Sequence, residues 1–421
     1  MSTWLLSNVR LWGEKSADVV IDGESISHVI PRGAADSTEP SLPDGVIIDH
    51  TVDGQNMVAL PGFANVHAHA DKSWWGLPWQ SWGGGPGLDG RISWERERRG
   101  ALNIPSAPIT TRVMREFLRH GTTSMRSHID VDLGIGLAGI DALEQSVAEL
   151  DGAIRTTAVA FPQDGVLRRD GVADLLRKAG EREIVSHIGG LDPGAIDRDP
   201  HGQLDLITGI AAEAGKGVDI HLHDEGTLGA LEIELLCDFT EQRNLQGKVT
   251  IAHGFGIVGM DPSHRRDVLE RMGVLGMSMT TVAPLRMRQF PLAEFDAAGV
   301  RFGFGTDGIR DLWAPYGDGD ILSIAWQYGH GSGVVRDETL RRVVEIATVD
   351  GAAMVSHDPL PALDRSGEAA LRGFESGSRA DVVLIDAENA LDALVRRVPR
   401  HTVIAGGRMF RCEDLALSPW E

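Results

Sequence analysis

The chain has 421 residues, of which 42% are hydrophobic and 24% are charged, and its formal net charge at pH 7 is -21. This length suits one large barrel with a small appended module, and the composition is that of a globular protein with a sizeable core. The excess of acidic residues disfavours nucleic acid and anionic membrane surfaces as partners. It favours a neutral or cationic small molecule, although net charge does not describe a local pocket.

The two cysteines, Cys237 and Cys412, lie too far apart in the sequence to indicate a disulfide framework or a thiolate zinc site. The N-terminal apolar stretch is too short and too interrupted for a signal peptide. The sequence contains no run of about 18 apolar residues that could cross a bilayer. We therefore expect a cytoplasmic protein, and the sequence leaves open whether it forms a homo-oligomer.

Short extended segments separated by Gly and Pro occur at both ends of the chain. Residues 4–9 show this pattern near the N-terminus, and residues 380–385 and 402–410 show it near the C-terminus. Such segments indicate β-strands. Because both ends share the pattern, we predict a small β-sandwich built from the two termini, comprising residues 1–57 and 366–421.

Between these ends, extended apolar segments alternate with helical patterns. The extended segments are 57–60 leading to His69, 122–129, 155–162, 183–188, 218–223, 248–253, 274–282 and 300–306. Strands of this kind with intervening helices indicate an α/β fold, a (β/α)₈ TIM barrel over residues 58–365. A doubly wound sheet would need a glycine-rich phosphate-binding turn after Leu60, and the sequence has none there.

Polar side chains gather where the predicted barrel strands end. His67 and His69 end the first strand, and alternate residues of a strand share one face. His221, His253 and Asp307 end the fifth, sixth and eighth strands. A TIM barrel brings these strand ends together at its active-site face. Three histidines and a carboxylate suit a divalent ion such as Zn²⁺ or Fe²⁺, which would activate water as a nucleophile.

The run from Leu60 to His69, LPGFANVHAH, resembles the opening of the amidohydrolase superfamily, and the resemblance extends over nearly the whole chain to residues 377–384. Within that superfamily, the sequence is most similar to the cytosine deaminase branch. The segments that carry this similarity are 69–72 (HADK), 94–96 (WER), 126–130 (RSHID), 160–165 (AFPQDG) and 311–315 (DLWAP).

The resemblance implies a site with a single metal ion. The implied ligands are His67, His69, His221 and Asp307. It also implies that His253, together with Asp307, carries the proton of the attacking water to the departing amine. The fourth predicted strand, residues 183–188, has no lysine of the kind that bridges two metals, which agrees with one ion.

Hydrolysis of a C–N bond at a ring carbon also needs an acid that protonates the ring nitrogen. Glu225, just beyond the fifth predicted strand, is the best candidate. The family places this acid three residues after the ligand histidine, and Asp224 stands at that spacing here. Asp224 therefore remains an alternative to Glu225 as the proton donor, and His223 remains an alternative to His221 as the ligand.

Several further residues are expected to contact the substrate. Gln163 offers both a hydrogen-bond donor and an acceptor, which suits the amide edge of a ring. By the resemblance, Lys72, His128 and Trp313 also line the pocket.

Two departures from the family pattern favour a substrate other than cytosine. Gly308 stands where the family has a second aspartate, and the seventh predicted strand ends in Ala283-Pro284 followed by Arg286 and Arg288. Such changes alter which polar groups of a ring can be paired. We predict a metal-dependent deaminase or aminohydrolase that releases ammonia or an amine from a small N-heterocycle by attack of metal-bound hydroxide.

Two alternatives remain at this point. The same metal could serve a cyclic amide or N-acyl amidohydrolase, which would form product without releasing ammonia. The chain could also be a non-catalytic metal-binding scaffold. The retention of His253, Asp307 and the Asp224-Glu225 pair disfavours a scaffold, because a scaffold does not need acid/base groups.

Overall fold

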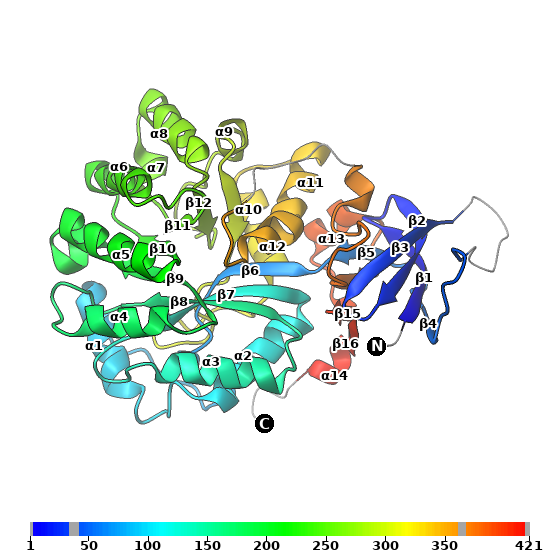
Figure 1. Cartoon of the computed structure of the whole chain (residues 1–421), viewed down its shortest axis with the longest axis horizontal. Coiled ribbons are helices and arrows are strands. Elements are labelled where there is room, and N and C mark those ends of the chain that lie inside the picture. Colours follow the sequence, from blue (N-terminus) through cyan, green and yellow to red (C-terminus); the bar gives the residue numbers. More distant parts are fainter. Residues whose placement is uncertain (1–2, 33–41, 361–367, 417–421) are drawn as a thin grey trace.

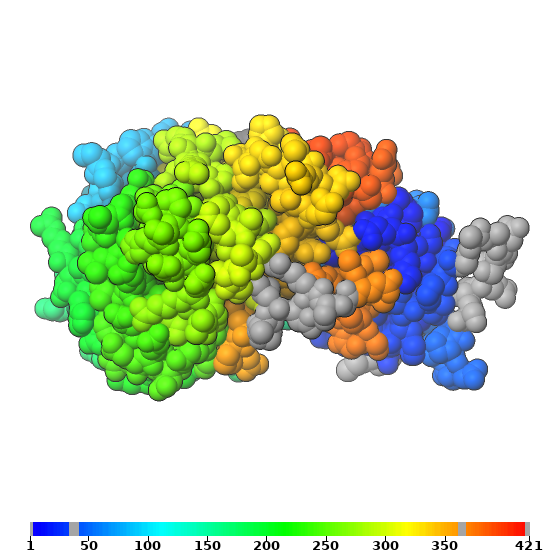
Figure 2. All heavy atoms as spheres, turned by 90° about the horizontal axis from the view of Figure 1, so that it is seen from above, coloured from blue at the N-terminus to red at the C-terminus, as the bar shows by residue number. Residues whose placement is uncertain are grey.

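The computed structural model describes residues 3–32, 42–360 and 368–416. It contains two sheets, one from the middle of the chain and one from its two ends. In Figure 1 the terminal sheet, blue and red, stands beside the barrel, which runs from light blue through green to yellow. Figure 2 shows these two parts packed against each other. No helix in the described ranges is both long and apolar enough to cross a bilayer.

The sheet from the middle of the chain forms the barrel, and its eight parallel strands neighbour one another in chain order. They are β6 (Phe63–Ala68), β7 (Thr122–Asp130), β8 (Arg155–Phe161), β9 (Val185–Leu191), β10 (Gly217–Leu222), β11 (Val249–His253), β12 (Ser278–Thr281) and β13 (Arg301–Phe304). A bridge between Ala68 and Asp307 brings the first strand next to the end of the last. The predicted (β/α)₈ barrel is confirmed.

Helices connect these strands and cover the barrel (Figure 1). The α-helices are α1 (Gly87–Arg98), α2 (Ala107–Arg119), α3 (Ala138–Glu149), α4 (Val172–Gly180), α5 (Pro200–Ala214), α6 (Gly226–Gln242), α7 (Gly256–Gly259), α8 (Pro262–Val274), α9 (Leu292–Ala298), α10 (Ile321–Gly331), α11 (Asp337–Glu345) and α12 (Gly351–Met354). Short π-helical turns span Pro193–Asp197 and Ile346–Asp350. Helix α5 shows how the sequence sets a helix start, because the Asp199 side chain accepts a hydrogen bond from the Gly202 amide and Pro200 follows directly.

The terminal sheet combines strands from both ends of the chain, as predicted. Its strands are β1 (Thr3–Leu11), β2 (Lys15–Asp22), β3 (Ser25–Pro31), β4 (His50–Asp53), β5 (Val58–Pro61), β14 (Val382–Ile385), β15 (Arg400–Ala405) and β16 (Arg408–Arg411). Strand β5 pairs with β1 on one side and with β14 on the other, so it joins the two termini into one sheet. The C-terminal part also contains α13 (Ala390–Arg396), α14 (Cys412–Leu415) and a 3₁₀ turn at Ala369–Leu371. The expected boundary between residues 365 and 366 lies outside the described residues, so the domain limits stay a prediction.

The sequence predicted one extended segment from residue 57 to His69, and the structure corrects this. Two strands in different sheets, β5 and β6, share that segment and meet at Gly62. A Cβ atom at Gly62 would lie 2.0 Å from Thr123 Oγ1, so only glycine lets the chain pass from one sheet to the other at this point. The apolar pattern runs through both strands because both are fully buried.

A buried ion pair crosses the barrel interior beneath the strand ends. The Arg126 guanidinium on β7 donates to Asp219 Oδ2 on β10 at 2.9 Å and to Thr250 Oγ1 on β11 at 3.0 Å. It also donates to the Met354 carbonyl oxygen. This one side chain therefore fixes the relative positions of three strands and α12, directly below the candidate site.

Candidate active site

The barrel brings the predicted metal ligands together at one end. His67 lies in β6, His69 directly follows that strand, and His221 lies in β10. All three imidazoles are buried. Asp307 follows β13, and its side chain is 42% exposed. The sequence prediction that these strand ends meet is therefore correct.

One donor atom each of His67, His69 and Asp307 lies within 4.8 Å of the others, and His221 lies next to His69. His69 Nε2 lies 3.2 Å from His221 Nε2, and Asp307 Oδ1 lies 3.3 Å from His69 Nε2 and 3.8 Å from His67 Nε2. Buried polar atoms in proteins almost always have hydrogen-bond partners. Here the buried nitrogens without such a partner among the described residues include His67 Nδ1 and Nε2, His69 Nδ1 and His221 Nδ1.

The protonation states of these imidazoles suit metal binding. Burial lowers the pKa of His67 to about 4, and it lowers the pKa values of His69 and His221 well below the ordinary value. Neutral imidazoles keep a free lone pair for a metal ion. With the Asp307 carboxylate they form a mixed nitrogen and oxygen donor set, which fits a divalent ion with an open position for water.

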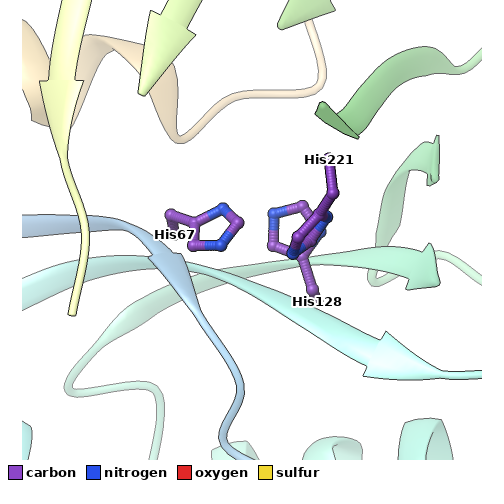
Figure 3. Close-up of side chains that lie close together, drawn as sticks. All are labelled: His67, His128 and His221. Carbon is purple, nitrogen blue, oxygen red and sulfur yellow. The ribbon is translucent and has the colours of Figure 1, made fainter. Parts of the chain in front are cut away.

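His128 forms a second possible donor set with two of the same imidazoles. His67, His128 and His221 also bring one nitrogen each within 4.8 Å of the others. Figure 3 shows the rings of His128 and His221 close together and opposite that of His67. His128 Nε2 faces Asp219 Oδ1 at 3.6 Å, however, and His128 does not line the cavity described below. The sequence predicted His128 as a substrate contact, but the structure places it beneath the ligands.

Two more histidines stand beside the ligands and face the cavity. His253 ends β11, and its ring centroid lies 4.2 Å from that of His223. His223 Nδ1 lies 3.0 Å from Asp192 Oδ2, and the His223 amide donates to Asp192 Oδ1 at 2.6 Å. Burial alone would lower the pKa of His223, but the hydrogen bond and charge of Asp192 and the charge of Asp307 raise it above its ordinary value.

The two acids that follow His223 do not reach the cavity. Glu225 begins α6 as an exposed N-cap residue. Asp224 is half-buried and hydrogen bonds with Glu232, and burial and the nearby Asp192 raise its pKa. Neither residue lines the cavity, whereas His223 does. His223 therefore lies in the cavity wall, where the sequence predicted Glu225 or Asp224.

The site opens into a cavity of about 1060 Å³ at the strand ends. Lys72 and Gln163, both predicted substrate contacts, line its buried part. Lys72 Nζ donates to Asp130 Oδ1 at 2.7 Å and to Gln163 Oε1 at 2.6 Å, and Gln163 Nε2 donates to Glu95 Oε2 at 2.8 Å. Burial alone would lower the pKa of Lys72, but the charges of Asp130 and Glu95 raise it, so the side chain stays cationic.

Trp313, the remaining predicted contact, is also in the cavity wall. Its indole Nε1 donates to Glu95 Oε2, and Arg91 Cζ lies 5.9 Å from the centroid of its ring. Glu95 therefore receives hydrogen bonds from both Trp313 and Gln163 and fixes the orientation of two side chains that face the substrate space.

Asp311 occupies the space that a side chain at position 308 would need. A Cβ atom at Gly308 would lie only 1.8 Å from Asp311 Oδ2. The other oxygen, Oδ1, accepts from the Trp313 and Ala314 amides at 2.8 Å each, which holds the carboxyl group in place. Asp311 is buried, lines the cavity, and has its pKa raised by burial to about 7. The carboxyl group of Asp311 therefore lies beside Gly308 and faces the cavity.

Sequence reasoning missed several of these groups. Asp192, Glu95, Asp130 and Asp311 were not predicted as site residues. Glu95, Asp130 and Asp311 lie within the segments that carried the family resemblance. Their position in these segments could have identified them as site residues. Asp192 follows β9 directly, as the other site residues follow their strands, and the strand-end rule could have found it.

Comparisons with known proteins agree with this geometry. Residues 107–410 match the amidohydrolase family. The crystal structure of N-isopropylammelide isopropylaminohydrolase from Burkholderia multivorans ATCC 17616 is 34% identical, covers 97% of this chain and 98% of its own, and has a TM-score of 0.86. A curated relative, N-isopropylammelide isopropyl amidohydrolase from Pseudomonas sp. (strain ADP), is 26% identical over 89% of this chain and 91% of its own length.

A further solved structure bears on the resemblance to the cytosine deaminase branch. The structure of 5-methylcytosine deaminase from Klebsiella pneumoniae, liganded with 5-fluorocytosine, has a TM-score of 0.76 and 21% identity, and each chain is covered to 97%. At this identity the likeness concerns the fold. The resemblance to this branch that the sequence predicted is confirmed at that level.

The convergent donor atoms predict that the purified protein binds one divalent ion and that His69 is needed for it. We expect the His69→Ala variant to bind Zn²⁺ at least about 100-fold more weakly than the wild type, because even outer-shell changes cost about 10–100-fold. Equilibrium competition with a chromogenic chelator measures this. The matched control is His264→Ala, because His264 is an exposed histidine paired with Glu234, far from the donor set in the sequence. Equal Zn²⁺ affinity in both variants would contradict the assignment.

Proposed function

This chain belongs to the amidohydrolase family, so it is a hydrolase of non-peptide C–N bonds, and we propose that it releases an amine from a small N-heterocycle that carries a substituted amino group. The observation that carries the proposal is the donor set of His67, His69, His221 and Asp307 at the buried end of a cavity whose wall presents fixed polar groups. The 34% identity over 97% of the chain with an N-isopropylammelide isopropylaminohydrolase supports this substrate class.

In this proposal His67, His69, His221 and Asp307 hold one Zn²⁺ or Fe²⁺ ion. The chemistry that such an ion supplies when bound is the activation of water near neutral pH. His69, His221 and Asp307 line the cavity, so these ligands lie where a substrate can reach the activated water. His128 does not line the cavity, and we assign it to the support of the ligands rather than to the substrate.

Proton transfer falls to residues beside the ligands. Cleavage forms a C–O bond at the ring carbon and breaks the C–N bond, and the departing nitrogen must gain a proton. His253 and Asp307 both line the cavity and can accept the proton of the attacking water. His223 faces the cavity and is oriented by Asp192, so it can donate a proton to the ring or to the leaving nitrogen.

Ring recognition falls to the buried wall of the cavity. The Lys72 ammonium has three N–H donors, and Asp130 and Gln163 take two of them. Glu95 Oε1 lies 3.9 Å from Lys72 Nζ, beyond hydrogen-bond distance, so the third N–H can donate to an oxygen or nitrogen acceptor of the ring. Asp311 Oδ2 can pair with a neighbouring N–H of the ring. An oxo-substituted N-heterocycle has a hydrogen-bond acceptor and a donor next to each other along one edge, so it can pair with both residues.

A panel of amino-substituted heterocycles tests the proposal. The zinc-loaded protein should release isopropylamine from N-isopropylammelide, or the corresponding amine from a related alkylamino ring, and chromatography of the amine and of the ring product measures both. Ring opening without release of amine would instead indicate a cyclic amide hydrolase. No turnover of any amino- or alkylamino-substituted ring would refute the proposed function.

The positions of His223 and Glu225 predict opposite results for two neighbouring variants. His223→Asn should lower kcat by about 100-fold or more, because it removes an acid/base group. Glu225→Gln should leave kcat close to the wild-type value, because Glu225 is exposed and lies outside the cavity wall. Steady-state kinetics with equal metal content in both variants measures the difference, and the reverse ranking would restore Glu225 as the proton donor.

The close approach of Asp311 to Gly308 predicts that two different substitutions weaken the same function. Asp311→Asn keeps the Oδ1 acceptor for the Trp313 and Ala314 amides but replaces the carboxyl Oδ2, and Gly308→Ala would push that carboxyl group aside. We expect each to lower kcat/KM by about 10- to 100-fold, the cost of an unpaired buried polar group. Metal content should not change. If both variants keep wild-type kcat/KM, Asp311 has only a structural role.

A further inference from the structure

The exposed part of the cavity is lined by three arginines from distant parts of the chain. Arg91 lies in α1, Arg286 in the loop after β12, and Arg397 directly after α13 of the terminal module. All three are exposed. None of them has a carboxylate partner within the described residues, although the chain has 61 acidic residues against 40 basic ones. The cavity wall therefore carries three guanidinium groups without an acidic partner, although the protein as a whole is acidic.

Two of these guanidinium groups lie over tryptophan rings of the same cavity wall. Arg91 Cζ is 5.9 Å from the Trp313 ring centroid, and Arg397 Cζ is 4.5 Å from the Trp326 ring centroid. The attraction between a guanidinium and an aromatic face holds the side chain without using its N–H donors. These donors remain free for a ligand, and their planar arrangement matches a carboxylate.

The two parts of the cavity differ in charge. The end near the histidines contains the carboxylates of Asp307 and Asp311, whereas Asp318 is the one other acid among the described lining residues. A concave wall with an excess of cations attracts anions more strongly than the same charges on a flat surface. The cavity of about 1060 Å³ is also slightly larger than the range of about 300–1,000 Å³ for small-molecule sites, so a single ring leaves space unfilled.

We propose that the substrate carries a carboxylate on its amino substituent and that Arg91, Arg286 and Arg397 bind this group. The inference rests on the proposed function and names its substrate class, an N-(carboxyalkyl)amino heterocycle. Hydrolysis adds water across the C–N bond, leaves an oxo group on the ring carbon, and transfers a proton to the departing nitrogen. The second product is therefore an amino acid rather than a simple alkylamine. This substrate is anionic, whereas the net charge of the chain favoured a neutral or cationic one.

Matched compounds on one ring test this substrate class with the zinc-loaded full chain. The probes are N-(carboxymethyl)ammelide, its neutral carboxamide analogue N-(carbamoylmethyl)ammelide, and N-isopropylammelide. We expect kcat/KM for the carboxylate to exceed that for the carboxamide by about 10-fold or more, as for a charge-assisted hydrogen bond. The advantage should fall as salt is raised, because exposed charges are screened.

Arginine variants assign the effect to the cavity. Arg286→Met and Arg397→Met should each lower kcat/KM for the carboxylate by about 10-fold and affect the carboxamide much less. The control is Arg288→Met, because Arg288 lies on the same loop, is exposed, and does not line the cavity. The proposal is overturned if the carboxylate and the carboxamide are processed equally, or if Arg288→Met has the same effect as Arg286→Met.

A binding measurement separates failure of this inference from failure of the proposed function. Calorimetric titration with the carboxylate and the carboxamide compounds requires no turnover. Tighter binding of the carboxylate that is lost in Arg286→Met supports the anion site even if no amine is released from any compound. Equal binding of the two compounds, or no binding of either, overturns the inference, including the case in which N-isopropylammelide is a good substrate.

Discussion

Burial deprives the imidazoles of His67, His69 and His221 of water, and the described residues provide no hydrogen-bond partner for several of their nitrogens. The same burial keeps these rings neutral, because it lowers their pKa values. Neutral imidazole nitrogens keep lone pairs that a divalent cation can bind. The barrel places Asp307 beside them. We propose that these four residues hold one divalent ion and that the rest of the active site is arranged around it.

From these four residues outward, the cavity has two parts with different proposed tasks. The buried part contains a connected set of polar groups, Lys72, Gln163, Glu95 and Asp130, whose hydrogen bonds to one another hold each side chain in a single orientation. Such fixed groups can discriminate between ring edges, because an unmatched buried group is costly. The exposed part contains arginines that need no preset geometry to attract an anion. In the proposed function, separate sets of residues therefore recognise the ring and its substituent.

The sequence predicted the barrel and four convergent donor residues because strand ends in this fold lie at one face, and polar residues after apolar strands are visible in a pattern. Other features depend on contacts that no pattern contains. The change of sheet at Gly62 follows from the nearness of Thr123. Glu225 seemed the proton donor because of its place in the chain, but the turn into α6 points that position outward and leaves His223 in the cavity. Asp311 fills the space beside Gly308, and residue identities alone do not show which side chain lies next to a glycine.

The most direct test of this account is to locate the metal itself. Crystals of the full chain loaded with Zn²⁺, measured at the zinc absorption edge, would give the ion position from its anomalous scattering. The account predicts one peak per chain at about 2.0–2.2 Å from a nitrogen of each of His67, His69 and His221 and from an oxygen of Asp307. A peak held by His67, His128 and His221 without Asp307, or the absence of any peak at this end of the barrel, would contradict it.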